Sequence, residues 1–205
     1  MATRSTGRAA GRSGGRRRSG TTPGALLLAP GAGADRTHHT LVAVTDAVAP
    51  MPSERMDFPY RKAGKRAPDR APVAMAAVVQ EAEALVAAAA IEPGRLVLGG
   101  RSFGGRMCSM AVAEGLPAAG LVLLSYPLHP PGKPEKMRTE HFPQLTVPCL
   151  FISGEKDPFG RPDEFDEAVV DIPGAVTQVW LPGGHDPRNA DTAIADAVTT
   201  WIATL

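Results

Sequence analysis

The sequence predicts an α/β protein with a mostly parallel sheet and helices on both faces. Short apolar runs alternate along the chain with longer segments of helical periodicity, a pattern typical of strands that are joined by helical crossovers. The first run, Ala25–Leu28, is apolar at every position. A run of this kind suits a strand that is buried on both faces, as strands of parallel sheets are.

In the first half of the chain, the second predicted strand has the weakest apolar pattern. Only Met56 and Phe58 are apolar near the position where this strand should lie. The elements that periodicity predicts in this half are a strand at Ala25–Leu28, a loop at Pro30–Asp35, a helix at His38–Val48, a strand near Arg55–Phe58, a basic loop at Pro59–Pro72 and an Ala-rich helix at Val73–Ala90.

The second half of the chain has clearer strands. A long Pro-rich segment, Tyr126–Thr146, shows neither helical nor strand periodicity and is predicted to be a loop. The other elements expected here are strands at Arg95–Gly99, Gly120–Leu124, Val147–Ser153 and Val176–Leu181, and helices at Met107–Glu114, Asp163–Val170 and Ala190–Leu205.

The segment Leu96–Arg106 reads LVLGGRSFGGR and contains a serine between two glycines in a G-x-S-x-G pattern. A sharp turn from a strand into a helix holds such a serine in a strained backbone conformation. Glycines on either side leave room for the neighbouring strand and helix. The pattern alone is common in Gly-rich turns, so the other strand ends decide whether Ser102 is a nucleophile.

Three predicted strands end near Ser102, Asp157 and His185. The carboxyl ends of parallel strands meet at one edge of the sheet. The order Ser, Asp, His along the chain is the one that α/β-hydrolases use. In this interpretation His185 is the general base that activates Ser102, and Asp157 orients the imidazole. The backbone amides of Phe103 and Ala32 are the candidate donors to an oxyanion.

Several segments resemble a known family: LLLAPGAGAD, GGRSFGGRM, YPLHPPGKPEK and GEKDPFG. They resemble the dienelactone-hydrolase-like branch of the α/β-hydrolase superfamily, and within it the Tex30/KANL3-type hydrolases. The resemblance covers about residues 25–205. It implies a compact α/β-hydrolase core without a large cap domain, and its triad falls on the same three residues reached above, Ser102, Asp157 and His185.

Three features limit what this resemblance implies. The strand near Met56 is weak, and the chain between it and the preceding helix looks shortened. Pro30 stands where the superfamily commonly has a histidine before the oxyanion glycine. Dienelactone hydrolases proper use a cysteine nucleophile, so that activity is not carried over to Ser102. Some relatives are scaffold subunits. A non-catalytic interaction module that retains the hydrolase fold is therefore the alternative to an enzyme.

The chain has 205 residues, of which 43% are hydrophobic, enough for one globular domain with a core. We place this domain at residues 23–205. The first twenty residues hold six arginines and no acid, so segment 1–22 is predicted to be a disordered arm. The remainder holds 16 basic and 21 acidic residues. Nucleic acid is therefore not an expected partner, except weakly through the arm.

The cysteines and apolar segments indicate the compartment. Only Cys108 and Cys149 are present, each in an apolar context, which favours the reducing cytoplasm over a disulfide framework. The apolar run Ala25–Ala29 follows basic residues but is too short for a signal peptide. No segment is expected to approach a membrane span, and no membrane partner is expected. The sequence leaves the oligomeric state open.

Other binding motifs fail on particular residues. Gly99–Gly104 has the glycine spacing of a P-loop, but Gly105 and Arg106 replace the required Lys and Ser/Thr. The segment GAGADR lacks the last glycine of a dinucleotide-binding motif. Adjacent histidines His38 and His39 near Asp35 are expected to be surface residues and not metal ligands. We therefore predict no cofactor and no metal.

These observations predict a cytoplasmic serine hydrolase that cleaves an ester, a thioester or a lactone in a small molecule. The loops Pro59–Pro72 and Tyr126–Thr146 are rich in basic residues. If both fold over the strand ends, they would surround the site with positive charge and favour an anionic substrate. The candidate substrate-binding residues are Arg61, Lys133, Tyr126 and His129, with His129 also the substitute base should His185 be misassigned.

Overall fold

The computed structural model describes residues 22–205. The predicted arm, residues 1–22, lies outside this range except for Thr22. Six strands form one sheet in the order β2-β1-β3-β4-β5-β6, and every pair of neighbours is parallel. The strands are β1 (Ala25–Ala29), β2 (Ser53–Arg55), β3 (Leu96–Arg101), β4 (Gly120–Leu124), β5 (Cys149–Gly154) and β6 (Val176–Leu181).

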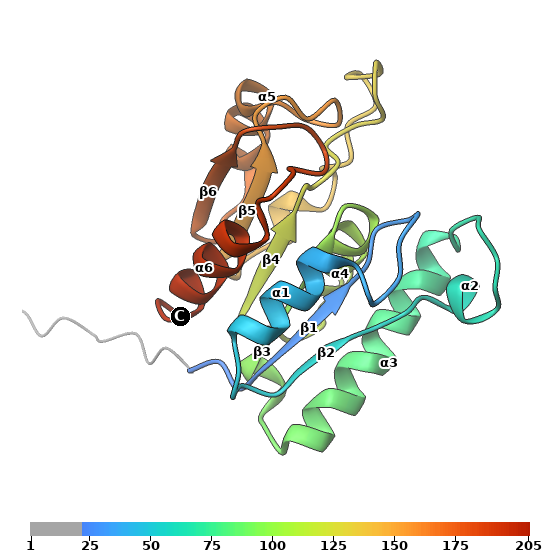
Figure 1. Cartoon of the computed structure of the whole chain (residues 1–205), viewed down its shortest axis with the longest axis vertical. Helices are drawn as coiled ribbons and strands as arrows, with labels where there is room; N and C mark the ends of the chain where they lie inside the picture. The colour runs from blue at the N-terminus through green and yellow to red at the C-terminus, as the bar shows by residue number, and fades with distance from the viewer. Residues whose placement is uncertain (1–21) are drawn as a thin grey trace, which may run out of the picture.

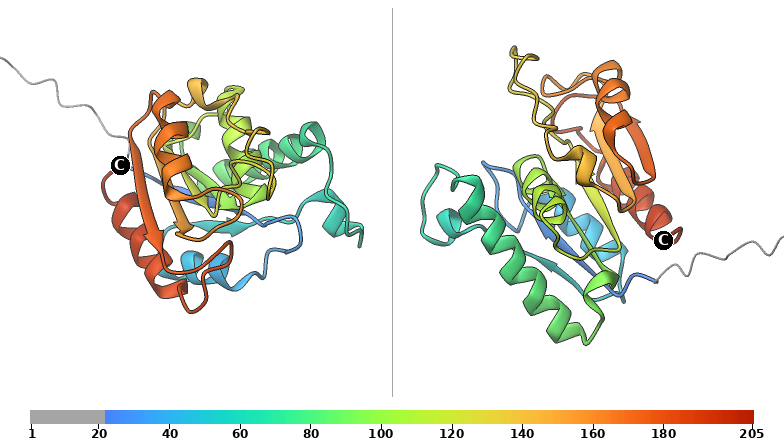
Figure 2. Two further views of the ribbon diagram at one scale, coloured as in Figure 1. Left: turned by 90° about the horizontal axis from the view of Figure 1, so that it is seen from above. Right: turned by 180° about the vertical axis from the view of Figure 1, so that it is seen from behind.

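Helices cover both faces of the sheet, which confirms the predicted fold class. Helices α1 (His39–Ala47) and α6 (Asp191–Ile202) pack together on one face, as Figure 1 shows. Helices α3 (Ala71–Ala89) and α4 (Phe103–Ala113) cover the other face, seen from behind in Figure 2. The shorter elements are α2 (Pro59–Lys62), α5 (Pro162–Ala168), η1 (Pro93–Arg95), η2 (Phe142–Gln144) and η3 (Val169–Asp171).

The sheet separates the core into two layers, because alternate side chains of each strand point to opposite faces. Leu26 and Leu28 of β1 pack toward α1 and α6, against residues such as Trp201. Leu27 of the same strand packs toward α3 and α4. All five residues of β1 are buried. This burial explains why the strand is apolar at every position instead of alternating.

The second strand lies earlier than predicted. It spans Ser53–Arg55 instead of Arg55–Phe58, and its three residues are polar. Because β2 is an edge strand and pairs only with β1, it does not need apolar side chains on both faces. Met56 and Phe58, which suggested the strand, are buried in the core after it has ended.

Two helices also differ from their predictions. The segment Pro59–Pro72 was expected to be a loop, but it begins with α2 and ends inside the first turn of α3. Pro59 occupies the first position of α2, where the missing amide hydrogen costs nothing. Helix α4 begins directly after Ser102 and not at Met107, because the glycines after the serine are part of its first turn.

Helix α3 is apolar enough to qualify as a membrane span by length and composition. Its mean hydropathy is 1.4 over the qualifying window, and it is the one such helix within residues 22–205. The prediction that no segment approaches a membrane span is wrong in that respect. Several of its side chains, among them Met75, Val78 and Leu85, are buried in the core against the sheet. A core helix of a globular domain meets the same criterion.

The connection from β4 to β5 is where a cap would be inserted. Within it, the single turn η2 is the one regular element that the structure describes. Phe142 of this turn is fully buried and packs on Tyr126 and Phe151, so the connection is held to the core. The domain therefore has no cap in the part of the chain that the structure describes, and the carboxyl ends of the strands are reached directly.

Candidate active site

Ser102 lies in a strained turn between β3 and α4. Its backbone has φ 50° and ψ −115°, a conformation that costs free energy for any residue with a side chain. A Cβ atom at Gly100 or Gly104 would overlap with the carbonyl oxygen of Ala29 at the end of β1. The two glycines of the G-x-S-x-G pattern are therefore required by the close approach of β1.

His185 lies within hydrogen-bonding distance of the other two residues predicted for a triad, Ser102 and Asp157. The distance from His185 Nε2 to Ser102 Oγ is 2.9 Å, and from His185 Nδ1 to Asp157 Oδ2 it is 2.8 Å. Asp157 is fully buried, and its second oxygen accepts a hydrogen bond of 2.9 Å from the amide of Phe159. His185 is partly exposed at 21%. The chain of contacts thus runs from a buried carboxylate to a reachable hydroxyl.

Two local features hold His185 and Asp157 in place. The ring of Phe159 lies against the imidazole, with centroids 4.2 Å apart. A Cβ atom at Gly154 would overlap with the carbonyl oxygens of Gly183 and Gly184. The loop that carries Asp157 and the loop that carries His185 are therefore in direct backbone contact, and this contact fixes the distance between the two side chains.

Phe103 and Ala32, the predicted oxyanion donors, belong to the elements beside Ser102. Phe103 is the first residue of α4, and amides in the first turn of a helix have no acceptor within the helix. Its ring packs edge-on against Phe58 at 5.1 Å. The carbonyl of Ala32 accepts a 2.7 Å hydrogen bond from the buried Tyr60 hydroxyl. Tyr60 therefore fixes the peptide group that follows Ala32.

The four predicted substrate-binding residues are not gathered in one place. Tyr126 is fully buried and donates to the carbonyl of Arg138 at 2.8 Å, and burial raises the pKa of its hydroxyl. His129 is 4% exposed and pairs with Glu164 at 3.1 Å. Lys133 is exposed, whereas Arg61 is paired with Asp35 at 3.4 Å. Tyr126 and His129 are buried and already have polar partners, so we leave them out of the proposed site.

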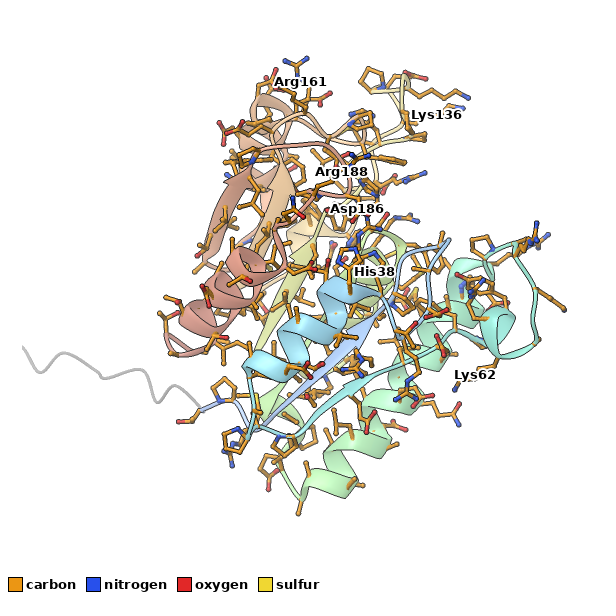
Figure 3. The ribbon with its side chains drawn as sticks, in the orientation of Figure 1. His38, Lys62, Lys136, Arg161, Asp186 and Arg188 are labelled. Atoms are coloured by element: carbon orange, nitrogen blue, oxygen red, sulfur yellow. The ribbon has the colours of Figure 1, made fainter. Side chains whose placement is uncertain are left out.

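The basic loops lie on two sides of the molecule. In Figure 3, Lys62 lies by α2 and Lys136 lies at the far tip of the loop after β4, with His38 and Asp186 between them. Lys62 is also paired with Glu81 at 2.6 Å. The expected ring of positive charge is therefore divided, and part of it is neutralised by neighbouring acids.

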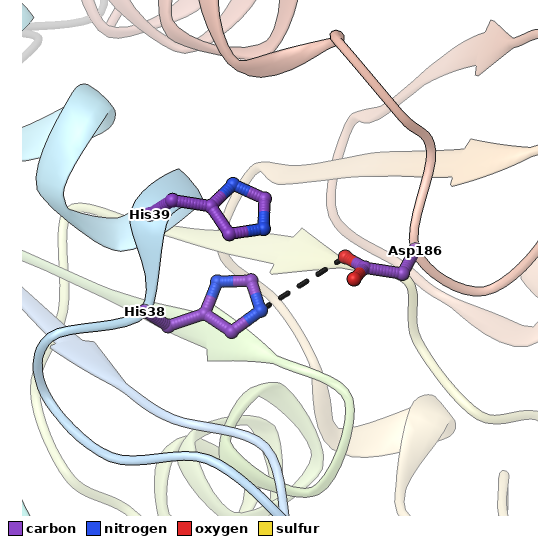
Figure 4. Close-up of side chains that lie close together, drawn as sticks. All are labelled: His38, His39 and Asp186. Carbon is purple, nitrogen blue, oxygen red and sulfur yellow. Dashed lines mark ion pairs between the residues drawn. The ribbon is translucent and has the colours of Figure 1, made fainter.

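His38, His39 and Asp186 have side-chain atoms within 4.8 Å of one another, the one such group among residues 22–205 that could hold a metal ion (Figure 4). Their polar atoms already have partners. The Nδ1 atom of His38 accepts a hydrogen bond from the backbone amide of Thr40. The proton of the neutral ring is therefore on Nε2, which lies 3.9 Å from Asp186 Oδ1. A metal ligand needs a free lone pair at that atom.

The remaining contacts of this group also disfavour a metal. His39 pairs with Asp191 at 2.6 Å, while Asp186 pairs with the Arg101 guanidinium at 3.0 Å. Burial, followed by the charge of Arg101, lowers the pKa of His38. A cation so close to the group opposes a second cation. Asp35, the acid that the sequence places near the histidines, instead accepts hydrogen bonds from Thr37.

The two cysteines do not offer an alternative nucleophile. Cys108 and Cys149 are both fully buried and unpaired with each other. Burial raises the pKa of each thiol to about 12, so neither forms the reactive thiolate near neutral pH. The hydroxyl of Ser102, by contrast, lies 2.9 Å from Nε2 of His185.

Three residues of the site were missed in the sequence: Arg101, Tyr60 and Phe159. Arg101 stands inside the G-x-S-x-G pattern, but no periodicity shows where its side chain points. Tyr60 lies in the segment predicted as a basic loop, where a buried aromatic residue was not expected. Phe159 follows Asp157 by two residues, and this short spacing is the one signal that could have indicated it.

A groove of about 740 Å³ lies away from these residues. It runs between α3 and α4 and is lined by mostly apolar side chains, including Met75, Val79, Met110 and Leu116. None of the three triad residues lines it. Nothing in the structure shows what would cover this groove, so we assign it no role.

A parallel α/β sheet with a strained serine at the turn after β3 defines the class of protein, an α/β protein with the fold of hydrolases. A family model described as an alpha/beta hydrolase domain matches residues 22–199. The chain belongs to this family. The finer resemblance to dienelactone-hydrolase-like proteins is a separate question that the family model does not address.

Solved structures share the fold at low sequence identity. Est1E from Butyrivibrio proteoclasticus, solved with ferulic acid, is 13% identical, with 92% of this chain and 91% of that chain covered at a TM-score of 0.74. A structure reported for the metagenome-derived lipolytic enzymes LipS and LipT is 14% identical, covering 88% and 94% at 0.70. An N-formylmaleamic acid deformylase from Pseudomonas putida S16 is 16% identical, covering 86% and 92% at 0.65.

Proposed function

We propose that the protein is a serine hydrolase that cleaves an ester, a thioester or a lactone through an acyl-enzyme on Ser102. The observation that carries this proposal is the hydrogen-bonded series from Ser102 through His185 to Asp157. A serine hydroxyl is a weak nucleophile at neutral pH, and an adjacent base is what activates it.

The roles of the three side chains follow from these contacts. His185 Nε2 takes the proton of Ser102 as the oxygen attacks the carbonyl carbon, and then gives this proton to the leaving alcohol or thiol. Asp157 accepts from Nδ1, which fixes the tautomer that leaves Nε2 free to act as a base. In the second half of the reaction, His185 activates a water molecule in the same way, and the acid is released from Ser102.

The tetrahedral intermediate carries negative charge on the former carbonyl oxygen. We assign its stabilisation to the amides of Phe103 and Ala32, the first beside the positive end of α4 and the second in the loop after β1. Tyr60 keeps the Ala32 loop in place through its hydrogen bond to the Ala32 carbonyl. In this proposal one donor comes from the first turn of α4 and the other from the loop after β1.

The open strand ends favour a small-molecule substrate. Structural neighbours include a lipolytic enzyme, Est1E solved with ferulic acid, and a deformylase. Lipolysis and deformylation are both transfers of an acyl group to water, which supports the proposal. We keep an anionic group on the substrate as part of the proposal, with Lys133 and Arg61 as its candidate contacts. The resemblance to the dienelactone-hydrolase-like branch supports a compact site, with serine in place of cysteine.

We also propose that the protein is cytoplasmic, because of its two cysteines. Two buried cysteines with no disulfide between them support a reducing cytoplasm. We propose no cofactor and no membrane partner.

The test is whether a fluorophosphonate probe labels the native protein on Ser102. Ser102→Ala should abolish labelling and ester turnover without changing the melting temperature, since the hydroxyl lies at the surface of a turn. His185→Ala should reduce turnover by a similar factor, because residues that act as one unit are not additive. Near-normal turnover in His185→Ala would contradict the assignment of the base.

The same experiment separates the enzyme from the alternative, a non-catalytic interaction module. A module of that kind needs the fold but not a reactive serine. Absence of labelling and of turnover in the folded wild-type protein would favour the module. Mapping of the label to a residue other than Ser102 would also overturn the proposal.

A further inference from the structure

Arg101 immediately precedes Ser102, and its side chain crosses from β3 to the loop after β6. The side chain is 12% exposed. Its Nη2 atom donates to the carbonyl oxygen of His185 at 2.9 Å and lies 3.0 Å from Asp186 Oδ1. These contacts join residues that are 84 positions apart in the sequence.

The same guanidinium also lies against the loop after β1. A Cβ atom at Gly31 would be 3.3 Å from Arg101 Nη1, which is tighter than an ordinary contact. His38, at the start of α1, faces the Asp186 carboxylate that Arg101 holds. From its place beside Ser102 in the nucleophile turn, Arg101 thus contacts two other segments that supply groups to the proposed reaction, the loop of Ala32 and the loop of His185.

We propose that Arg101 is a positioning residue that holds the loop of residues 182–188 in place, so that the His185 ring meets Ser102. This inference rests on the proposed function for its effect on turnover. Arginine suits the task because its planar guanidinium can bond a carbonyl and a carboxylate in a fixed geometry, while a lysine ammonium is a flexible point charge. The backbone near Gly154 holds this loop at Gly183 and Gly184, and Arg101 bonds the two residues that follow, His185 and Asp186.

Other roles for Arg101 agree less well with the contacts. Its Nη2 atom is already engaged with His185 and Asp186, so a substrate carboxylate that bound this edge of the guanidinium would have to displace these partners. Asp186 is 55% exposed, and its contribution depends on the arginine beside it. A shift of His185 by about 1 Å is enough to lower a rate on the order of 10²-fold. We therefore expect the effect of losing Arg101 to fall on kcat.

The experiment compares Arg101→Ala, Arg101→Lys and Asp186→Asn with the wild-type protein. Arg101→Ala should lower kcat on the order of 10²-fold with KM unchanged, and millimolar guanidinium should restore part of the loss. Arg101→Lys should recover less than guanidinium does, and Asp186→Asn should lose less than Arg101→Ala, because the bond to the His185 carbonyl remains. Arg161→Ala, which removes the exposed side chain of the N-cap residue before α5, is the matched control and should behave as wild type.

A second readout does not depend on catalysis. Hydrogen exchange in residues 182–188 should be faster in Arg101→Ala than in wild type and unchanged in Arg161→Ala. Unchanged exchange in Arg101→Ala would overturn the inference, as would a higher KM with normal kcat, which would make Arg101 a substrate contact. If the wild-type protein is neither labelled nor active, the proposed function fails, and exchange alone decides the role of Arg101.

Discussion

His141 is held neutral inside the protein by its surroundings. Burial, and then the charge of Arg106, lowers the pKa of His141 from 6.5 to about 4. Its Nε2 atom lies 2.8 Å from the hydroxyl of Ser109, which itself donates to the carbonyl of Arg106. Since that hydroxyl hydrogen is already used, His141 is the donor of the shared bond. The neutral ring is thus the form that the folded protein needs.

This shift makes stability depend on pH. The unfolded chain binds a proton at His141 below pH 6.5, whereas the folded chain does so only below about 4. Stability from this residue is complete above 6.5 and is lost as the pH falls toward 4. The loss is at most about 3.5 kcal/mol, at about 1.4 kcal/mol per pKa unit.

Urea unfolding across this pH range checks the prediction. His141→Gln keeps a donor toward Ser109 but cannot gain a proton. Its free energy of unfolding should therefore fall less than that of wild type between pH 6.5 and 4.5, while both proteins share the losses from their carboxylates. Parallel curves for the two proteins would contradict the assignment.

At the scale of single residues, the sequence predicted those site residues whose neighbours in the chain form a recognisable pattern. Ser102, Asp157 and His185 each follow an apolar strand and stand among glycines or prolines, and the structure has them in contact. Tyr126 and His129 were chosen for their chemistry alone, and burial gives them other partners. Whether a polar side chain faces solvent or the core depends on residues far away in the chain, which no local pattern contains.

At the scale of elements, the approach of α4 to β1 depends on Gly104. A Cβ atom there would overlap with the carbonyl oxygens of Ala29 and Pro30. Alanine normally favours a helix over glycine by up to about 1 kcal/mol. The steric overlap should reverse that preference, because β1 and α4 would have to separate.

We therefore expect Gly104→Ala to lower the melting temperature by several degrees or to prevent folding, and to abolish probe labelling of Ser102. Gly94→Ala is the matched control, since a Cβ atom at Gly94 has nothing within 4 Å. Differential scanning fluorimetry on both variants measures the difference. Equal melting temperatures for Gly104→Ala and wild type would show that the turn tolerates a side chain.

The elements that the sequence missed share a physical cause. β2 is short, polar and at the edge of the sheet, so burial does not impose an apolar pattern on it. The helix α2 has four residues, too few for a periodicity of 3.6 to be visible. The central strands β3, β4 and β5 were found in almost their full extent, because burial on both faces requires continuous apolar runs.

At the scale of the whole molecule, the charge around the site is uneven. Lys133 and its neighbours lie on one side of the strand ends, while the charges of Arg61 and Lys62 on the other are paired with acids. Exposed charges act over a Debye length of about 10 Å at 0.1 M salt. If an anionic substrate is drawn by these residues, added salt should weaken the attraction.

We expect kcat/KM for a carboxylated p-nitrophenyl ester to fall with rising salt, and that for a neutral ester to stay constant. Lys133→Ala should weaken the salt response of the carboxylated ester more than Arg61→Ala, because Arg61 is already paired with Asp35. Arg95→Ala serves as the control, because Arg95 ends η1 and lies at the amino end of β3, whereas the site lies at the carboxyl ends of the strands. The same salt response for both esters would remove the anionic group from the proposed substrate.

The fold class could be predicted from the alternation of strands and helices, but the order of the strands in the sheet could not. The first strand lies between β2 and β3 in the sheet, although the three strands are separated by long connections. Pairing partners depend on contacts between residues far apart in sequence, which a single chain does not reveal. The two-layered core follows only once this order is known.

The spacing of the three triad residues along the chain also matters while the protein is being made. His185 follows Ser102 by 83 residues. It lies on the loop after β6, which is the last strand along the chain. At about 5–20 residues per second, a ribosome adds those residues in roughly 4–17 s. Under the proposed mechanism, a nascent or prematurely terminated chain that ends before residue 185 carries the serine without its base. Such truncated products would therefore not hydrolyse cellular esters before quality control removes them.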